Sequence, residues 1–180
     1  TIVLDLESGA VVHVGRGKGG DALQHFWIRL RRARAKIEAV AIDMSPAYID
    51  AVLTYLPQAT LVFDRFHVIK LYNDKLSELR RALYHELKDT MQKKVLKGVR
   101  WLLLKRQENL DPTRREPQRL GEALRLCEPL ATAYYLKDEL NEIWEQEDQE
   151  PAQALLLDWV TYAESTGICM LQDFAKTLRA

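Results

Sequence analysis

Cysteine is scarce in this sequence, and long apolar runs are absent. The 180 residues include two cysteines, Cys127 and Cys169, which stand far apart and form no CxxC motif. They are predicted to be reduced and mostly packed, as in a cytoplasmic protein. No apolar run approaches the ~18 residues that a membrane-spanning helix needs, and the first residues lack a signal-peptide pattern. The sequence therefore predicts no membrane segment.

Net charge is also absent, but the charges are unevenly distributed. The chain has 26 Lys and Arg against 26 Asp and Glu. Residues 69–120 hold 14 basic and 7 acidic side chains, whereas residues 121–180 hold 4 basic and 12 acidic ones. The basic middle segment fits a phosphate-binding surface, and it equally fits long helices that carry charge because they face water.

The first 68 residues have the pattern of an α/β unit. The predicted elements, in chain order, are strands over 1–6 and 10–14, a helix over 21–35, a strand over 37–43, a helix over 45–56 and a strand over 59–63. Asp21 is a candidate cap of the first helix, and Ser45-Pro46 is a typical start of the second. This order predicts a mixed α/β sheet.

The loop at residues 16–20 is rich in glycine, but it does not match the GxxxxGK[ST] motif. A nucleotide-binding P-loop protein is therefore disfavoured. After His67 the pattern changes, because nearly all of residues 69–180 has helical periodicity, and it predicts about five helices and no strand. Trp101, Trp144 and Trp159 stand at apolar helical positions, so they are predicted to be core residues and not base-stacking platforms.

Asp43 is the most informative polar residue. It ends a predicted buried strand and is followed at once by the helix start at Ser45. Ligands and metals bind at the carboxyl ends of strands in open α/β sheets. A carboxylate there, with no Lys or Arg within six residues, favours neutralisation by a cation. The alternative is that Asp43 only helps to cap the following helix.

Asp64 and His67 repeat this arrangement at the next strand end. Their i, i+3 spacing at a helix start places both side chains on one face. They are either a pair close to a metal, or a helix cap with a histidine packed beneath it.

A basic helical surface is predicted after His67, and DNA phosphates are its candidate ligands. The residues predicted to contact DNA are Lys70, Lys75, Arg80, Arg81, Lys94, Lys97 and Arg100. The alternative is a solvated face on which these residues pair with Glu78, Glu86 and Asp89.

Three stretches have a specific resemblance to one family. They are AIDMSPAY (41–48), LPQA (56–59) and FDRFHVIK (63–70). They resemble the insertion-sequence transposases of the ISL-three group, bacterial DDE enzymes with an RNase H-like core. Residues 3–9, 101–110 and 157–167 are similar to further parts of that family, so the resemblance covers nearly the whole chain. DMSPAY and DRFHV are its most specific parts.

The resemblance implies two-metal phosphoryl transfer on DNA, in which two Asp and one Glu hold two Mg²⁺ ions, with Mn²⁺ as a substitute. By strand order, Asp43 matches the second catalytic Asp and is thereby an implied metal ligand. Asp64 and His67 match an accessory C/D-x-x-H motif near the active site. A rival assignment makes Asp64 the second catalytic Asp.

The sequence departs from the family pattern at two carboxylates. The family's first Asp would precede Thr1, and its Glu lies in a Gly/Asn-rich stretch that this chain does not contain. Asp5 stands on the second core strand and does not replace the first Asp. The family's N-terminal zinc-finger and helix-turn-helix regions are missing too. We therefore expect a fragment that does not cleave DNA by itself.

The expected fold is a partial RNase H-like mixed sheet over residues 1–68, followed by an all-α helical insertion over residues 69–180. The expected partners are DNA, both terminal inverted repeats and target, and further copies of the full protein. The expected location is the bacterial cytoplasm, in association with the nucleoid. The rival hypothesis is a non-catalytic helical module, for DNA binding or dimerisation, on a relict core.

Overall fold

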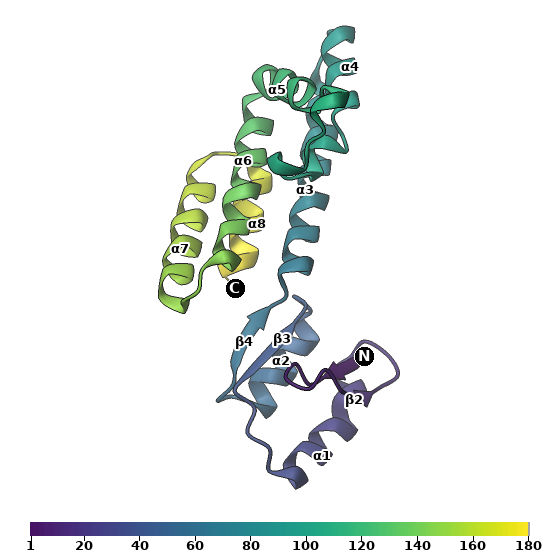
Figure 1. The fold of residues 1–180 in the computed structure, drawn as a ribbon, viewed down its shortest axis with the longest axis vertical. Coiled ribbons are helices and arrows are strands. Elements are labelled where there is room, and N and C mark those ends of the chain that lie inside the picture. The colour runs from purple at the N-terminus through teal and green to yellow at the C-terminus, as the bar shows by residue number, and fades with distance from the viewer. Residues whose placement is uncertain (180) are drawn as a thin grey trace. The chain divides into compact units, whose positions relative to one another are not determined.

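The computed structural model describes residues 1–179, and its chain divides into two compact units (Figure 1). The first unit is Thr1–Val68 and the second begins at Ile69. The first unit is α/β and the second is helical, which confirms the expected fold class. Whether these units correspond to separate folding domains stays a prediction.

The first unit begins with the expected hairpin. Strands β1 (Ile2–Leu4) and β2 (Val11–Val14) pair antiparallel. Gly9 has a φ of 70°, a left-handed conformation that glycine adopts without strain, and this lets the chain turn back. The Asp5 carboxylate accepts hydrogen bonds from Ser8 Oγ and the Glu7 N–H within the same turn. Asp5 is therefore a turn-forming residue.

A β-α-β unit follows. Strands β3 (Ala39–Ile42) and β4 (Thr60–Phe63) pair parallel, with helix α2 (Pro46–Tyr55) between them in sequence. Within residues 1–179 the strands form two separate two-stranded sheets, whereas the sequence order had predicted one mixed sheet. The difference has a physical reason: residue patterns identify strands, but strand pairing depends on contacts distant in sequence.

The core of this unit lies under the first two helices. Leu23, Trp27 and Ala51 are buried, and flanking apolar side chains pack against them. Helix α1 (Gln24–Ala33) is shorter than predicted and ends at Arg34, whose φ is 53°. Asp21 does not cap it, because a 3₁₀ turn, η1 (Gly20–Leu23), precedes the α-helix and neither element has a side-chain cap.

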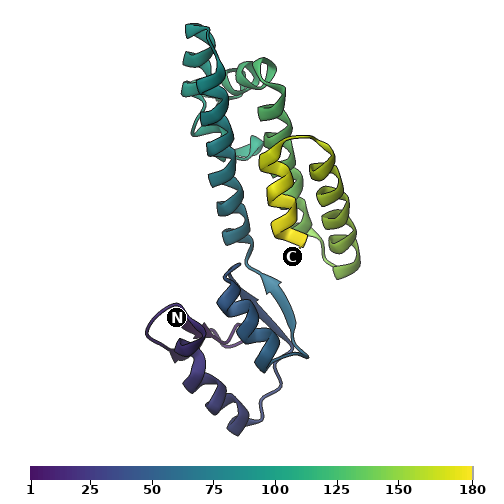
Figure 2. The ribbon, with the colours of Figure 1, turned by 180° about the vertical axis from the view of Figure 1, so that it is seen from behind.

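The second unit is built from helices. Within the described residues these are α3 (Arg65–Glu86, which begins in the first unit), α4 (Thr90–Gly98), α5 (Glu116–Leu126), α6 (Glu128–Glu142), α7 (Gln149–Ser165) and α8 (Cys169–Arg179). Short 3₁₀ turns η2 (Leu102–Leu104), η3 (Gln107–Asn109), η4 (Pro112–Arg114) and η5 (Ile143–Glu145) connect some of them. Helices α6, α7 and α8 lie side by side in both views (Figure 1 and Figure 2).

An aromatic cluster forms the centre of the helical unit. The rings of Tyr72, Trp159 and Phe174 meet edge to face, and all three side chains are buried. The Tyr72 hydroxyl donates to the Ala133 carbonyl over 2.7 Å, and Trp159 Nε1 donates to the Leu136 carbonyl over 2.8 Å. Helices α3, α6, α7 and α8 are thus joined by apolar contact and by satisfied polar groups.

Lys137 of α6 is an unusual buried residue. Its side chain is 1% exposed, and its Nζ donates to the carbonyls of Leu103 and Lys105 over 2.6 and 2.7 Å. Burial lowers the pKa of Lys137 to about 8, because the charged form loses its hydration. The ammonium holds the turn after α4 against α6.

This lowered pKa predicts a rise in stability with pH. Between about pH 8 and the ordinary lysine value of about 10.4, the unfolded chain holds a proton that the folded chain has released. The free energy of unfolding should therefore increase over this range, by up to about 3 kcal/mol for this group. Urea denaturation of the wild type and Lys137→Met measures it. The gap between the two proteins should widen in favour of the wild type, and a constant gap would contradict the prediction.

Candidate functional site at two neighbouring strand ends

Asp43 and Asp64 each follow the last residue of a strand, and the two strands are neighbours. Strands β3 and β4 run parallel, with Ile42 opposite Phe63. The N–H of Asp64 donates to the carbonyl of Ile42 over 2.8 Å, which continues the pairing one step beyond the strands. The two aspartates therefore lie side by side at the carboxyl edge of this sheet, where α/β proteins bind ligands.

The Asp43 carboxylate is held by the backbone that follows it. Its Oδ1 accepts a hydrogen bond from the Ser45 N–H over 3.0 Å, a turn that directs the chain into α2. Ser45 stands at the N-cap and Pro46 is the first helical residue, as predicted, although the serine hydroxyl makes no capping bond. Within residues 1–179, this is the one hydrogen bond of the Asp43 side chain, and it uses Oδ1.

A hard divalent cation suits this carboxylate, because Mg²⁺ prefers oxygen ligands. Asp43 is half-buried, and an ionised group in that position gains from a neutralising partner. The described residues contain no group of three or more His, Cys, Asp or Glu side chains placed to hold a metal. Asp43 therefore fits as one ligand of a metal and not as a complete site.

Asp64 and His67 form a hydrogen-bonded pair at the start of α3. Asp64 Oδ1 accepts from the Phe66 N–H and Oδ2 accepts from His67 Nδ1, both over 2.9 Å. The bond from the Phe66 N–H is the larger cause of the lowered pKa of Asp64, and the bond from His67 adds to it. The carboxyl is thus ionised at neutral pH.

This geometry combines the two sequence interpretations of the pair. Asp64 does cap α3, since it satisfies an N–H of the first helical turn. His67 is not packed beneath the helix: its side chain is 46% exposed. Because Nδ1 donates to Asp64, the ring is fixed and Nε2 is left for another partner. Whether the pair assists Asp43 stays a prediction.

The basic residues predicted to contact DNA do not all reach solvent. Those with exposed side chains are Lys70, Arg81, Lys94, Lys97 and Arg100. Lys75 pairs with Glu78 over 3.4 Å. Arg80 is 9% exposed and its Nη1 donates to the Leu96 carbonyl over 3.4 Å. Burial, and then the neighbouring Arg100, lower the pKa of Arg80. Arg80 therefore packs α3 against α4 and is not part of the exposed basic surface.

The tryptophans divide between core and surface. Trp159 is 4% exposed, as predicted, and Trp144 is half-buried. Trp101 was predicted to be a core residue, and this is wrong, because its side chain is 65% exposed. It follows the end of α4, where the chain leaves the helix after Gly98. That glycine, and the arginine before Trp101, were the sequence signals for a turn at the surface.

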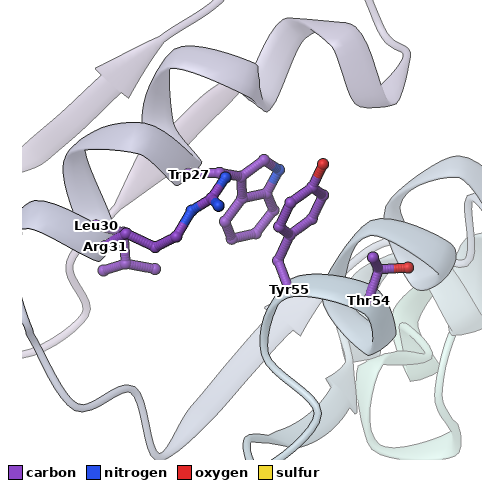
Figure 3. Close-up of a pocket in the computed structure, with 5 residues that line it drawn as sticks. All are labelled: Trp27, Leu30, Arg31, Thr54 and Tyr55. Atoms are coloured by element: carbon purple, nitrogen blue, oxygen red, sulfur yellow. The ribbon is translucent and has the colours of Figure 1, made fainter.

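A separate hollow lies at the other end of α2. It is lined by Trp27, Leu30, Arg31, Thr54 and Tyr55, and Figure 3 shows the indole facing the phenol. The two rings stack with centroids 4.9 Å apart. Tyr55 is the last residue of α2, a helix of ten residues or ~15 Å, whereas Asp43 precedes its start. The hollow has no carboxylate in its lining, so the strand ends remain the candidate catalytic site.

No helix among the described residues is long and apolar enough to cross a membrane.

Comparison with known proteins gives consistent matches. A family model described as a transposase, DDE_Tnp_ISL3, matches residues 1–180. The transposase for insertion sequence element IS1001 of Bordetella parapertussis is 35% identical over 182 residues, which cover 99% of this chain and 44% of that protein. The transposase for insertion sequence element IS1557 of Mycobacterium tuberculosis H37Rv is 25% identical over 202 residues, covering 99% of this chain and 45% of that protein.

The chain thus spans less than half the length of these relatives. No solved structure matches it.

Proposed function

The chain belongs to the DDE_Tnp_ISL3 family of transposases, and from this premise we propose that it forms part of the catalytic core and of the DNA-contacting surface of a transposase. The observation that supports this most directly is the placement of Asp43 and Asp64 side by side at two parallel strand ends. The relatives are named as transposases of insertion sequences, so the proposed substrate is DNA.

Asp43 is the proposed catalytic carboxylate. Its turn with Ser45 uses one oxygen, and the other is the proposed metal ligand. Mg²⁺, or Mn²⁺, bound there would neutralise charge on the phosphoryl group and activate the attacking oxygen. The other ligands would come from parts of a full-length protein outside this chain. The role of Asp43 is to hold its share of that site in place before DNA arrives.

Asp64 and His67 are the proposed accessory pair. The Asp64 carboxylate orients the imidazole by accepting the hydrogen bond from Nδ1. Nε2 takes no part in that bond, so it is available for a hydrogen bond with a water molecule near Asp43. This role needs no direct contact between Asp64 and the metal.

The proposed DNA-contacting surface is the α4 basic segment, which we define as Lys94, Lys97 and Arg100. All three side chains are exposed. Among the described residues, none of the three has a carboxylate partner within salt-bridge distance. The alternative of a solvated face neutralised by Glu78, Glu86 and Asp89 is thus not observed for this segment. Unneutralised cations favour a polyanion.

Salt dependence tests this surface. With three phosphate contacts, affinity for a short duplex should fall about 40-fold between 50 and 200 mM salt, because bound counterions are released on binding. Replacing Lys94 and Lys97 with Gln should make the slope of log affinity against log salt less negative by about 2. Fluorescence anisotropy of a labelled duplex gives both values.

The matched control removes two exposed cations from another place. Arg16 and Lys18 lie in the loop after β2, and their replacement by Gln lowers the net charge equally. The salt slope of this control should match the wild type. Equal slopes in both double variants, or binding that does not change with salt, would refute the proposed surface.

The second proposal, which also comes from the sequence, is that the chain self-associates through its helical unit. Light scattering of the 180-residue chain distinguishes it: a stable dimer supports an assembly role, whereas a monomer that binds duplex DNA supports the contact role.

A further inference from the structure

Trp101 is held outside the core by its neighbours. Val99 before it and Leu102 and Leu103 after it are at most 5% exposed, whereas Trp101 is 65% exposed. The Leu103 N–H donates to the Val99 carbonyl over 3.0 Å, so the short turn that presents Trp101 is closed by a hydrogen bond. Because the residues on both sides of the turn are buried, the backbone holds the indole at the surface in a defined position.

A cation is fixed over this indole. The Arg100 guanidinium carbon lies 4.6 Å from the centroid of the Trp101 ring, which is cation–π distance. Arg119 of α5 approaches the same turn, where its Nη2 donates to the Gly98 carbonyl over 2.8 Å. The described residues show no carboxylate paired with Arg100 or Arg119. An exposed aromatic ring therefore stands in a positively charged neighbourhood.

The surroundings favour a nucleic acid over a protein partner. Protein-binding tryptophans are usually surrounded by other apolar side chains. Within the described residues 86–125, two large apolar side chains are mostly exposed, Trp101 and Met91, and Met91 lies in the first turn of α4, at the end of that helix away from Trp101. A flat aromatic ring beside cations that have no carboxylate partner suits a ligand that contains both planar rings and anionic groups. Unpaired nucleotides have this composition, since each base has an exposed π-face and each linkage a phosphate.

We propose that Trp101 and Arg100 form a stacking platform for an unpaired base of a DNA strand. The proposal rests on the proposed DNA-contacting function and extends it, since the α4 basic segment attracts phosphates whereas the indole selects strands with unstacked bases. Bases within a duplex are already stacked, so a duplex cannot use the platform along its length. Frayed ends and single-stranded segments can.

The test compares a 12-nucleotide oligothymidylate with a 12-base-pair duplex, using the 180-residue chain. Trp101→Ala should weaken binding of the single strand about tenfold or more, as for other stacking aromatics. Binding of the duplex should change less than about twofold, and the salt slope should be unchanged, because the indole has no charge. Urea denaturation should show an unaltered midpoint, since the side chain is mostly exposed.

Tryptophan fluorescence provides a direct second readout. Stacking on a base should quench the emission of Trp101, and Trp101→Phe should abolish that quenching while keeping part of the single-strand affinity. Unchanged single-strand binding in Trp101→Ala would overturn the platform. If replacing Lys94 and Lys97 with Gln still reduced the salt dependence of duplex binding, the proposed DNA-contacting surface would be supported even though the platform was not. A Trp101→Ala protein that lost self-association but kept single-strand binding would overturn the platform in favour of a protein contact.

Discussion

Replacing Asp43 with Asn is expected to lower DNA strand cleavage at least about 10³-fold in a full-length transposase that contains this chain. The expected loss follows from removing one charged ligand of the proposed metal ion, which would contribute several kcal/mol to stabilising the transition state. Folding should be preserved, because the Asn side-chain oxygen can still accept the Ser45 N–H that holds this turn. Cleavage of a labelled terminal-repeat duplex measures the first effect and urea denaturation the second.

Asp50→Asn is the matched control, since Asp50 is an exposed carboxylate on α2 of the same unit. It should leave cleavage within about twofold of the wild type, as is usual for an exposed side chain away from the site. Asp64→Asn should reduce cleavage about tenfold to 100-fold, the usual cost of losing a group that orients another. If Asp43→Asn were fully active and Asp64→Asn were inactive, the catalytic carboxylate would be Asp64 and not Asp43.

Replacing Tyr72 with Ala is expected to destabilise the helical unit by about 4 kcal/mol, the usual cost of deleting a buried aromatic ring. The ring is fully buried, meets Trp159 and Phe174, and donates to Ala133. Burial also raises the pKa of its hydroxyl, so Tyr72 is a neutral donor at any physiological pH. The midpoint of urea unfolding by circular dichroism measures the effect.

Two variants separate packing from hydrogen bonding at this position. Tyr72→Phe keeps the ring and removes one hydrogen bond, so it should cost about 1 kcal/mol. Tyr162→Ala removes a tyrosine that is 55% exposed and should cost under about 1 kcal/mol. If Tyr72→Ala and Tyr162→Ala were equally stable, the aromatic cluster would not be the centre of this unit.

Much of the candidate site could be predicted from local sequence. An apolar strand, an Asp and a Ser-Pro helix start describe the β3–α2 junction, because each feature depends on neighbouring residues alone. The i, i+3 spacing of Asp64 and His67 likewise predicted a shared face, and the two side chains do meet. The proximity of Asp43 to Asp64 depends in addition on the parallel pairing of β3 with β4.

The two wrong predictions concern the burial of single side chains. Hydrophobic periodicity describes burial only as an average over a segment. Arg80 belongs to a charged run and was predicted to face DNA, yet it reaches the Leu96 carbonyl of α4. Trp101 belongs to an apolar run and was predicted to be core, yet the turn after α4 exposes it. For Arg80 the neighbouring helix α4 decides the environment, and its position is not encoded in the residues next to Arg80. For Trp101 the turn after α4 decides it.

The sequence by itself determined the family, the types of the main elements and the residue at each strand end. These follow from short motifs and from backbone preferences that act over a few residues. The tertiary structure alone decided that the strands pair as two small sheets, that Asp64 takes its backbone partner from Ile42, and that Trp101 rather than Arg80 is at the surface. Strand partners and burial are set by contacts between distant segments, which local patterns do not specify.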